Sequence, residues 1–335
     1  MRGLLKGLAI ALVAVIVVAG GVLLTMRLGW WNPSYEEVKA AQAAPPSTFE
    51  RYGTANIHMR DEGPRDGPVV IMLHSSMTNL REWDAWSDKL KDSYRVIRFD
   101  WPPYGLSTDT APLRGMPGIV ELLEKIVERK GLDSFVLVGT SSGSTIATLY
   151  TAKHPEKVRA LALSTLPLKA PPPPEFSRLL WSMVWVHENL VPNYYPPYYY
   201  RVSLSELYGK PERLTDETVE WYYQTNNIPG GFDNVRQYYT ANQKAVWAKG
   251  AGDEAAQIRV PILLQWGDAD PVLPKYLSDD AVKQFSNAPV DVIHYPDVSH
   301  YPMLELPEKT GADLRTWLDA TLGDDAPATE TKDTP

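Results

Sequence analysis

The sequence predicts an α/β fold with a mostly parallel central sheet, helices on both faces, a mostly helical lid insertion and an N-terminal transmembrane helix. Short aliphatic and β-branched runs alternate with segments of helical period, the pattern of a parallel sheet covered on both faces. One such run, Phe135–Val138, leads through a glycine- and serine-rich turn into a helical segment. The ligand site is therefore expected outside the carboxyl ends of the strands.

Length and composition exclude several classes of protein. The chain has 335 residues, 44% of them hydrophobic, which suffices for one large domain with an insertion. A net charge of −8, with no basic stripe carrying interleaved aromatic residues, argues against a nucleic-acid partner. The absence of cysteine excludes disulfides, thiolate chemistry and a cysteine-based zinc site, and does not identify a compartment.

The uncharged run Gly7–Met26 predicts a helix of roughly 30 Å, the thickness of the hydrocarbon core of a bilayer. Arg2 and Lys6 precede it, and two tryptophans follow it where interfacial aromatic residues are expected. We predict a retained single-pass anchor with a cytoplasmic N-terminus and an extracytoplasmic catalytic domain. The alternative is secretion after signal cleavage near 17–19, although signal cores are normally shorter, about 7–15 residues.

The remaining elements follow from local pattern. A hairpin is predicted around Gly53, from 48–52 and 55–60, and helices over 80–90 and 119–130. Further buried strands are predicted at 69–73, 95–99, 135–138, 158–163, 262–266 and 290–293.

A segment of different character interrupts this alternation between 167 and 257. It opens with four prolines, 171–174, and contains ten of the 18 tyrosines. Helical periods reappear at 176–190 and 215–224, so we predict a helical lid, some of whose aromatic side chains line a substrate pocket. The predicted organisation is anchor 1–31, tether 32–47, core 48–166 and 258–322, lid 167–257, and disordered acidic tail 323–335.

The turn Gly139-Thr140-Ser141-Ser142-Gly143 is a G-x-S-x-G pentapeptide between a strand and a helix, the pattern of a nucleophile elbow. Glycines at both ends permit close backbone approach, and the turn exposes the Ser141 hydroxyl at a helix N-terminus. A helix N-cap is the alternative role of this serine. The pentapeptide alone is weakly specific, so its context has to support the assignment.

A serine nucleophile needs a base and a group that orients the base. Asp268 and Asp270 follow one late strand, and His300 lies in the loop after the last strand. The order Ser, Asp, His is the order of a known hydrolase fold.

Taken together, these motifs resemble the α/β-hydrolases of the lidded, haloalkane-dehalogenase-like or esterase-like type. The resemblance extends from about Phe49 to Leu322. It also rests on Leu73-His74-Ser75-Ser76 as the oxyanion loop, on the turn from Asp100 to Ser107, and on Ser299–Glu305 as the histidine loop.

The resemblance implies that Ser141 is the nucleophile, His300 the base and Asp270 the acid, with Asp268 the competing acid. It implies an oxyanion hole made of the backbone N–H groups of Ser76 and Ser142. The sequence departs from the family pattern where Ser75, Pro103 and Ser299 replace glycines, and Ser75 is itself a candidate hydroxyl donor.

The six histidines show no metal-ligand spacing, so we expect no metal and no cofactor. His74 is expected to fix the oxyanion loop, and Asp100 to hold a turn.

A serine at the elbow implies acyl transfer, whereas relatives that open epoxides or displace halide use aspartate there. The main hypothesis is hydrolysis of a fairly hydrophobic small-molecule ester through an acyl-enzyme. The alternatives are a C–C bond hydrolase or lactonase with the same triad, cofactor-free perhydrolysis, and a catalytically silent, membrane-tethered binding protein.

Overall fold

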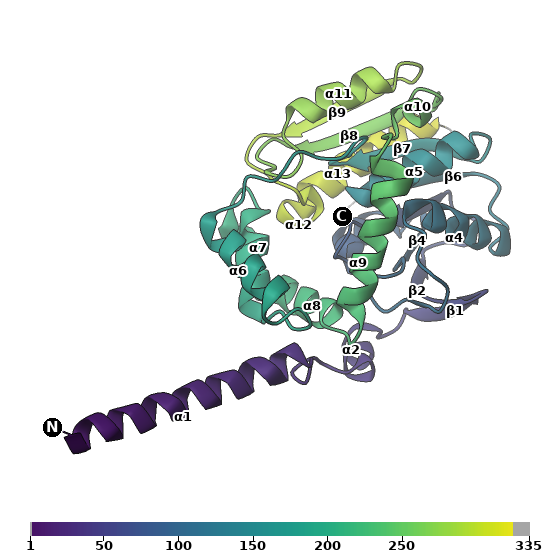
Figure 1. The fold of residues 1–335 in the computed structure, drawn as a ribbon. Coiled ribbons are helices and arrows are strands. Elements are labelled where there is room, and N and C mark those ends of the chain that lie inside the picture. Colours follow the sequence, from purple (N-terminus) through teal and green to yellow (C-terminus); the bar gives the residue numbers. More distant parts are fainter. Residues whose placement is uncertain (1, 324–335) are drawn as a thin grey trace, which may run out of the picture.

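The protein, described by a computed structural model over residues 2–323, is built on a nine-stranded sheet (Figure 1). The strand order is β1-β2-β4-β3-β6-β7-β8-β9, with β5 paired to β2. Every pair from β4 to β9 in that order is parallel, and the pairs that β2 makes are antiparallel. The predicted mostly parallel sheet is confirmed. Its strands are β1 Thr48–Tyr52, β2 Ala55–Glu62, β3 Val69–Leu73, β4 Arg95–Phe99, β5 Thr108–Asp109, β6 Phe135–Thr140, β7 Val158–Ser164, β8 Ile262–Gly267 and β9 Val290–Tyr295.

Helices cover both faces of this sheet, and the alternation of side chains along β3 shows how. Val70 and Met72 join the buried cluster that contains residues of α3 and α13, whereas Ile71 and Leu73 join the cluster that contains residues of α4 and α5. Both faces of the central strands are thus apolar, as a parallel sheet requires. The helices around the core are α3 Asp84–Leu90, α4 Met116–Arg129, α5 Ser142–Lys153, α10 Gly252–Ala255, α11 Tyr276–Gln284, α12 Pro302–Glu305 and α13 Pro307–Leu322.

The helix expected over 80–90 is divided. Its first turn, Leu80–Trp83, is a 3-10 helix, and α3 begins at Asp84. Asn79 caps the 3-10 turn by accepting the N–H of Arg81, which fixes where the chain leaves the oxyanion loop.

The segment 167–257 carries four longer helices, two 3-10 or π turns and α10. The periods predicted at 176–190 and 215–224 correspond to α6 and α8. The sequence did not predict α7, which starts at Pro197 directly after Pro196, where a proline at the first helical position is tolerated. These elements are α6 Arg178–Asn189, α7 Pro197–Glu206, η2 Pro211–Arg213, α8 Asp216–Asn226, α9 Gly231–Asn242 and η3 Gln243–Trp247.

The segment predicted as a tether contains a short helix, α2 Tyr35–Gln42. Ser34 and Glu37 form a reciprocal capping box at its start, and Val38 is buried. This helix is not among the predicted elements, although the S-x-x-E pattern of a capping box is present in the sequence. The link between the N-terminal helix and the core is therefore ordered rather than extended.

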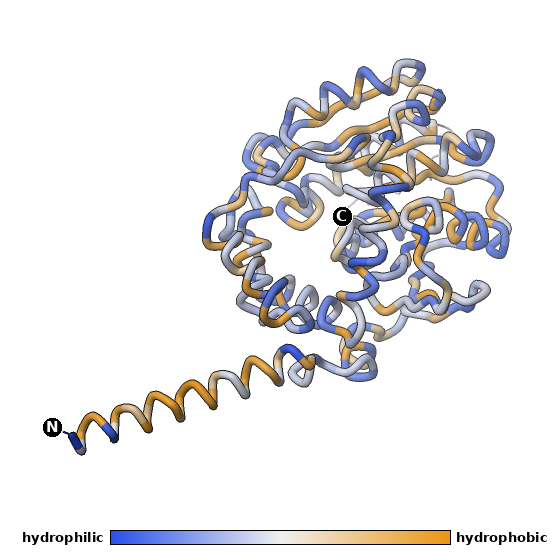
Figure 2. The backbone as a smooth tube through the Cα atoms, viewed as in Figure 1, coloured by the Kyte–Doolittle hydropathy of each residue, from blue (hydrophilic) through white to orange (hydrophobic). Residues whose placement is uncertain are grey.

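The N-terminal helix α1, Arg2–Arg27, projects from the rest of the molecule (Figure 1), and none of its residues is buried. It is apolar along almost its whole length (Figure 2) and is the one helix of the described residues long and apolar enough to cross a membrane. A signal sequence passes the same test. Most of the predicted disordered tail, 324–335, lies outside the described residues.

Candidate active site

Ser141 occupies the turn between β6 and α5 with φ 48° and ψ −120°. A positive φ is strained for a residue with a side chain, and such outliers gather at functional sites. The two other non-glycine residues with positive φ among those described are Met77 and Thr165, which lie next to the predicted oxyanion loop and after β7. The strained backbone of this chain is thus concentrated around one end of the sheet.

The glycines on either side of the elbow are required by close backbone contacts. A Cβ on Gly143 would lie 2.1 Å from the carbonyl oxygen of Leu73, and a Cβ on Gly139 would lie 2.6 Å from the carbonyl oxygen of Gly143. Neither contact is possible for a side chain, so the close approach inferred from the pentapeptide is confirmed. The same contact brings the start of α5 against the end of β3.

The structure brings His300 and Asp270 together from the loops that follow β9 and β8. The Nδ1 atom of His300 lies 2.7 Å from Oδ2 of Asp270, and both side chains are buried. Burial alone would lower the pKa of His300. The charge and hydrogen bond of Asp270, together with the charge of Glu82, outweigh burial and raise that pKa above its ordinary value.

The competing carboxylate, Asp268, has other partners. Its Oδ1 lies 2.6 Å from Nδ1 of His294, and its Oδ2 accepts a hydrogen bond from Lys275. Asp270 instead uses Oδ1 to accept the backbone N–H groups of Val272 and Leu273 and leaves Oδ2 for His300. The geometry therefore supports the choice of Asp270 as the acid.

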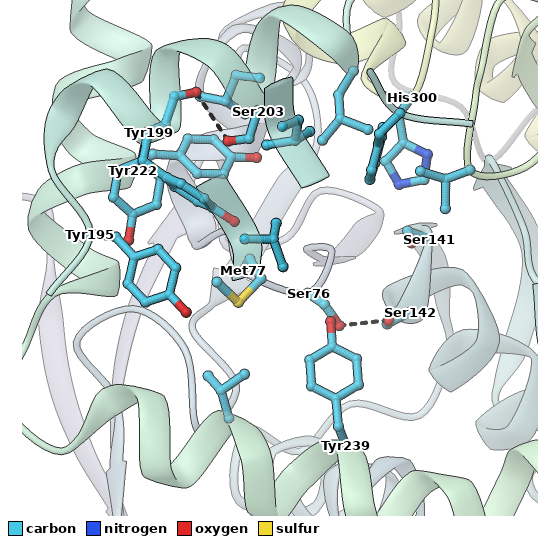
Figure 3. A pocket seen from close by; sticks show the side chains of 18 of the residues that line it. Ser76, Met77, Ser141, Ser142, Tyr195, Tyr199, Ser203, Tyr222, Tyr239 and His300 are labelled. Carbon is cyan, nitrogen blue, oxygen red and sulfur yellow. Dashed lines mark hydrogen bonds between the residues drawn. The ribbon is translucent and has the colours of Figure 1, made fainter. Parts of the chain in front are cut away.

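Ser141, His300, Ser76 and Ser142 all line one cavity with a volume of about 750 Å³ (Figure 3). The lid and the histidine loop supply most of its wall, and much of that wall is aromatic. The aromatic residues that line the cavity are Phe176, Tyr195, Tyr199, Tyr200, Tyr222, Phe232, Tyr239, Trp247 and Tyr301. Sequence pattern could not select these residues from the other aromatic residues of the lid, because their orientation depends on contacts distant in sequence.

The predicted oxyanion donors lie on two adjacent segments. Ser142 is the first residue of α5, and Ser76 follows β3; their hydroxyl groups are 2.7 Å apart (Figure 3). Among the described residues, neither backbone N–H has an acceptor. A helix N-terminus favours negative charge, so this pair of N–H groups is suited to a developing oxyanion. The Tyr239 hydroxyl of the lid also points toward Ser76.

Ser75, the serine in place of the usual glycine, is engaged elsewhere. Its N–H and its hydroxyl both donate to the carboxylate of Glu82, at 2.8 and 3.0 Å. Thr78 donates to the same carboxylate at 3.0 Å. The proposed role of Ser75 as a hydroxyl donor to the site is therefore disfavoured, and its substitution is explained by a buried partner.

Glu82 is a residue that sequence reasoning missed. Burial raises its pKa to about 7, even though hydrogen bonds from Ser75 and Thr78 oppose the shift. The only local signal was a carboxylate next to the apolar Leu80 and Trp83 of the 3-10 turn. Next to it, His74 stacks on Trp101 and contacts the Ser75 carbonyl, and burial lowers its pKa to about 4. His74 is thus neutral and braces the oxyanion loop, as expected.

Asp100 holds its turn, as expected. It accepts the backbone N–H groups of Leu80 and Leu106 and pairs with Nδ1 of His58 at 2.7 Å. No group of three or more histidine, aspartate or glutamate side chains within residues 2–323 is arranged to hold a metal ion. The expectation of a cofactor-free site stays a prediction.

Comparison with known proteins agrees with this architecture. Residues 68–307 match the family described as alpha/beta hydrolase fold. The chain is 25% identical over 240 residues to a bifunctional esterase/perhydrolase from Acinetobacter calcoaceticus, covering 67% of this chain and 82% of that protein. It is 24% identical over 257 residues to a 2-hydroxymuconate semialdehyde hydrolase from a Pseudomonas species, covering 73% and 85%.

Among solved structures, a membrane phospholipase A described as a bacterial virulence factor matches with a TM-score of 0.68 and 23% identity, over 94% of this chain and 99% of that one. A lipase structure from Acinetobacter baumannii also has a TM-score of 0.68, with 18% identity, over 87% and 97%. At these identities the structures show a shared fold. With the family match over most of the core, they establish that this chain belongs to the α/β-hydrolase fold family and is a hydrolase.

Proposed function

We propose that this protein is a membrane-anchored serine hydrolase that cleaves carboxylic esters of a fairly hydrophobic substrate. One observation carries the proposal. Ser141, on its strained turn, and His300, held by the buried Asp270, line the same largely apolar cavity. The nucleophile, the base and space for an apolar substrate thus coincide.

In this mechanism the Ser141 oxygen attacks the ester carbonyl while Nε2 of His300 takes the hydroxyl proton. The carbonyl π electrons move onto oxygen, where the N–H groups of Ser76 and Ser142 stabilise the negative charge. Collapse of the tetrahedral intermediate breaks the ester C–O bond, and His300 returns the proton to the leaving alcohol. Water then attacks the acyl-enzyme by the same steps, releasing the acid and free Ser141.

Two charges develop in this reaction, a positive charge on His300 and a negative charge on the substrate oxygen, and each has a group beside it that stabilises it. Asp270 accepts a hydrogen bond from the Nδ1–H group of His300, which leaves Nε2 free to receive the proton of Ser141 and stabilises the imidazolium that forms. Each oxyanion donor contributes about 3–4 kcal/mol to transition-state binding in well-studied cases.

The substrate class is inferred from the cavity and from relatives. A cavity of about 750 Å³ with an aromatic wall suits a substrate with a sizeable apolar part. The similar proteins described as an esterase/perhydrolase, a lipase and a phospholipase act on esters by their descriptions, which supports the same bond type here.

Nitrophenyl esters of increasing acyl length would test the proposal on the wild type, Ser141→Ala and His300→Ala. We expect turnover that both substitutions abolish, with an optimum that reports the size of the cavity. A fluorophosphonate probe should label the wild type but not Ser141→Ala. Ser203→Ala is the matched control, because Ser203 lines the same cavity but donates its hydroxyl to the Tyr200 carbonyl; it should still be labelled.

Hydrolysis of a C–C bond is the second candidate, favoured by the similarity to the semialdehyde hydrolase. The same triad serves both reactions, so the substrate decides. This candidate is favoured if the probe labels the protein and the protein cleaves β-diketone-like compounds but no simple esters. Lactones, and esters with added peroxide, would be assayed alongside to test the lactonase and perhydrolase alternatives. If the protein turns over none of these substrates and the fluorophosphonate probe does not label it, the catalytically silent binding protein is the better description.

The anchor is part of the proposal. A signal peptide is removed with little trace in the folded protein, whereas the end of α1 contacts the lid. Arg27 donates to the carbonyl oxygens of Asn189 and Leu190 at 3.2 Å, and Asn193 donates to the carbonyl of Arg27 at 2.9 Å. These contacts support retention of the helix as a single span. The charges of Arg2 and Lys6 before it favour a cytoplasmic N-terminus and hence a hydrolase outside the cytoplasm.

A further inference from the structure

Two apolar stripes run along the lid helix α6, about 100° apart around its axis. Its inner face lines the cavity through Leu180 and Val184, which are one helical turn apart. Its outer face exposes Trp181 and Trp185, also one turn apart, with exposed fractions of 45% and 59%. Single exposed apolar residues are ordinary, but aromatic residues stacked along one helix face indicate a covered surface.

Other exposed apolar side chains extend this surface to the end of the helix. We call it the α6 outer face and define it by the exposed apolar side chains Leu179, Trp181, Trp185, Val186 and Leu190, which flank the exposed polar residues Ser182 and Asn189; each of the five is at least about one-third exposed. Amphipathic helices that lie in a bilayer interface place tryptophan and leucine on such a face, buried about 5–10 Å into the boundary between headgroups and acyl chains.

The contacts of α1 place this face at the level where the anchor ends. Arg27, the last residue of α1, donates to the two carbonyl oxygens at the end of α6. Trp31 packs against Tyr194 with ring centroids 6.0 Å apart, and Asn32 donates to the carbonyl of Asn193. Figure 1 shows α1 leaving the molecule on the side of the lid, opposite α11.

A span that ends at Arg27 therefore holds the end of α6 at the bilayer surface. Trp30, 73% exposed, and Trp31 lie at the same level, where interfacial tryptophans are found. The α6 outer face continues directly from these residues. Exposing the α6 outer face to water is unfavourable, and the nearest apolar phase that can cover it is the membrane that α1 spans.

We propose that the α6 outer face is a membrane-binding surface that rests in the interface of the bilayer spanned by α1. This inference rests on the membrane anchor of the proposed function. It goes beyond that function because it states that the membrane covers the exposed side of the lid helix α6. Since the inner face of α6 lines the cavity, it also identifies the substrate class as amphiphilic esters that reside in the membrane. The cavity wall would then lie one helix diameter from the lipid.

The absence of cysteine makes a direct test simple, because one introduced cysteine gives a unique label. The full chain would be reconstituted into phosphatidylcholine vesicles with an environment-sensitive fluorophore on Ser182→Cys. Ser182 is exposed and lies between the two tryptophans of the face. The matched control is Lys283→Cys on α11, whose side chain is 76% exposed on the opposite side of the molecule. Val13→Cys, inside α1, reports insertion of the span.

Lipids that carry a nitroxide near the headgroup or near the chain end then report depth. We expect the label at Ser182 to be quenched several-fold more strongly by the shallow nitroxide than the label at Lys283, and the label at Val13 to be quenched most by the deep nitroxide. Replacing both Trp181 and Trp185 with serine should reduce the quenching at Ser182 without changing that at Val13.

Each other outcome overturns the proposal. A label at Ser182 that fluoresces as in water, like the label at Lys283, would show that the face is solvated. A label in an apolar environment that no lipid nitroxide quenches would show that protein, such as a second copy of this chain, covers the face. A label at Val13 that no lipid nitroxide quenches would show that α1 does not span the bilayer. Because no arm measures hydrolysis, the test is independent of whether the ester substrate is correct.

Discussion

Replacing Asp270 with asparagine changes one atom and inverts the hydrogen bond that orients His300. The Oδ1 atom of Asp270 accepts the N–H groups of Val272 and Leu273 at 2.8 and 3.0 Å. An asparagine keeps these two bonds only with its carbonyl oxygen in that position, because the amide NH₂ cannot accept them. Its NH₂ group is then directed at Nδ1 of His300, 2.7 Å away in the native pair.

A donor in this position requires an unprotonated Nδ1 and hence a proton on Nε2, the atom that has to receive the proton of Ser141. The geometry is intact, but the tautomer is wrong. The equivalent change in a well-studied serine protease lowers kcat by about four orders of magnitude, or roughly 5 kcal/mol in the barrier. We expect a loss of this size in Asp270→Asn with a nearly unchanged melting temperature.

Asp268→Asn is the matched control, because it makes the same change two residues away in the same loop. Asp268 pairs with His294 and Lys275 at the edge of the site, so its loss should change kcat by less than about tenfold. Steady-state kinetics on the best nitrophenyl ester, with circular dichroism to verify folding, would compare the two. Full activity in Asp270→Asn, or the large loss in Asp268→Asn instead, would refute the assignment of the acid.

Two further perturbations test the site from other directions. Activity requires neutral His300, whose pKa is raised by Asp270, so kcat/KM should fall as the pH drops through that pKa. The midpoint of this acidic limb should lie above about 6.5, the ordinary histidine pKa, and a midpoint below that value would contradict the raised pKa. A methyl group on Gly143 meets the Leu73 carbonyl at 2.1 Å, so Gly143→Ala should abolish activity and lower the free energy of unfolding by about 1–3 kcal/mol or more. Gly231→Ala, whose added Cβ meets nothing closer than 3.6 Å, is its control in the same urea titration and should leave both quantities unchanged.

The parts of the fold that sequence predicted are those set by local pattern. Buried runs such as Val69–Leu73 have the length and β-branched content of parallel strands, and the elbow glycines have a steric requirement that only glycine meets. The order of Ser141, Asp270 and His300 along the chain, each at the end of a strand, placed them at one edge of the sheet before any contact was known.

What sequence did not predict depends on contacts between distant residues. The hydrogen bonds from Ser75 to Glu82 explain an unusual serine, but no local feature shows that this carboxylate turns inward. The α7 helix begins at Pro197 directly after Pro196, and two consecutive prolines obscure a helix start in the sequence pattern. Which side chains of the lid face the cavity, Tyr239 among them, likewise depends on tertiary packing.

The lid is hydrogen-bonded to the loop that carries His300, and this constrains how the substrate cavity can change. The backbone N–H of His300 donates to the carbonyl of Leu207 at 3.1 Å, in the lid. The carboxylate of Glu305 accepts the N–H groups of Ser299 and Gly209 at 2.6 and 2.9 Å, which joins the histidine loop to the segment after α7. We therefore expect substitutions that reshape the cavity to preserve activity only where these three hydrogen bonds survive. Lid side chains on the cavity wall that make none of them, such as Phe176 and Trp247, should tolerate change, whereas changes in the backbone after α7 should displace His300.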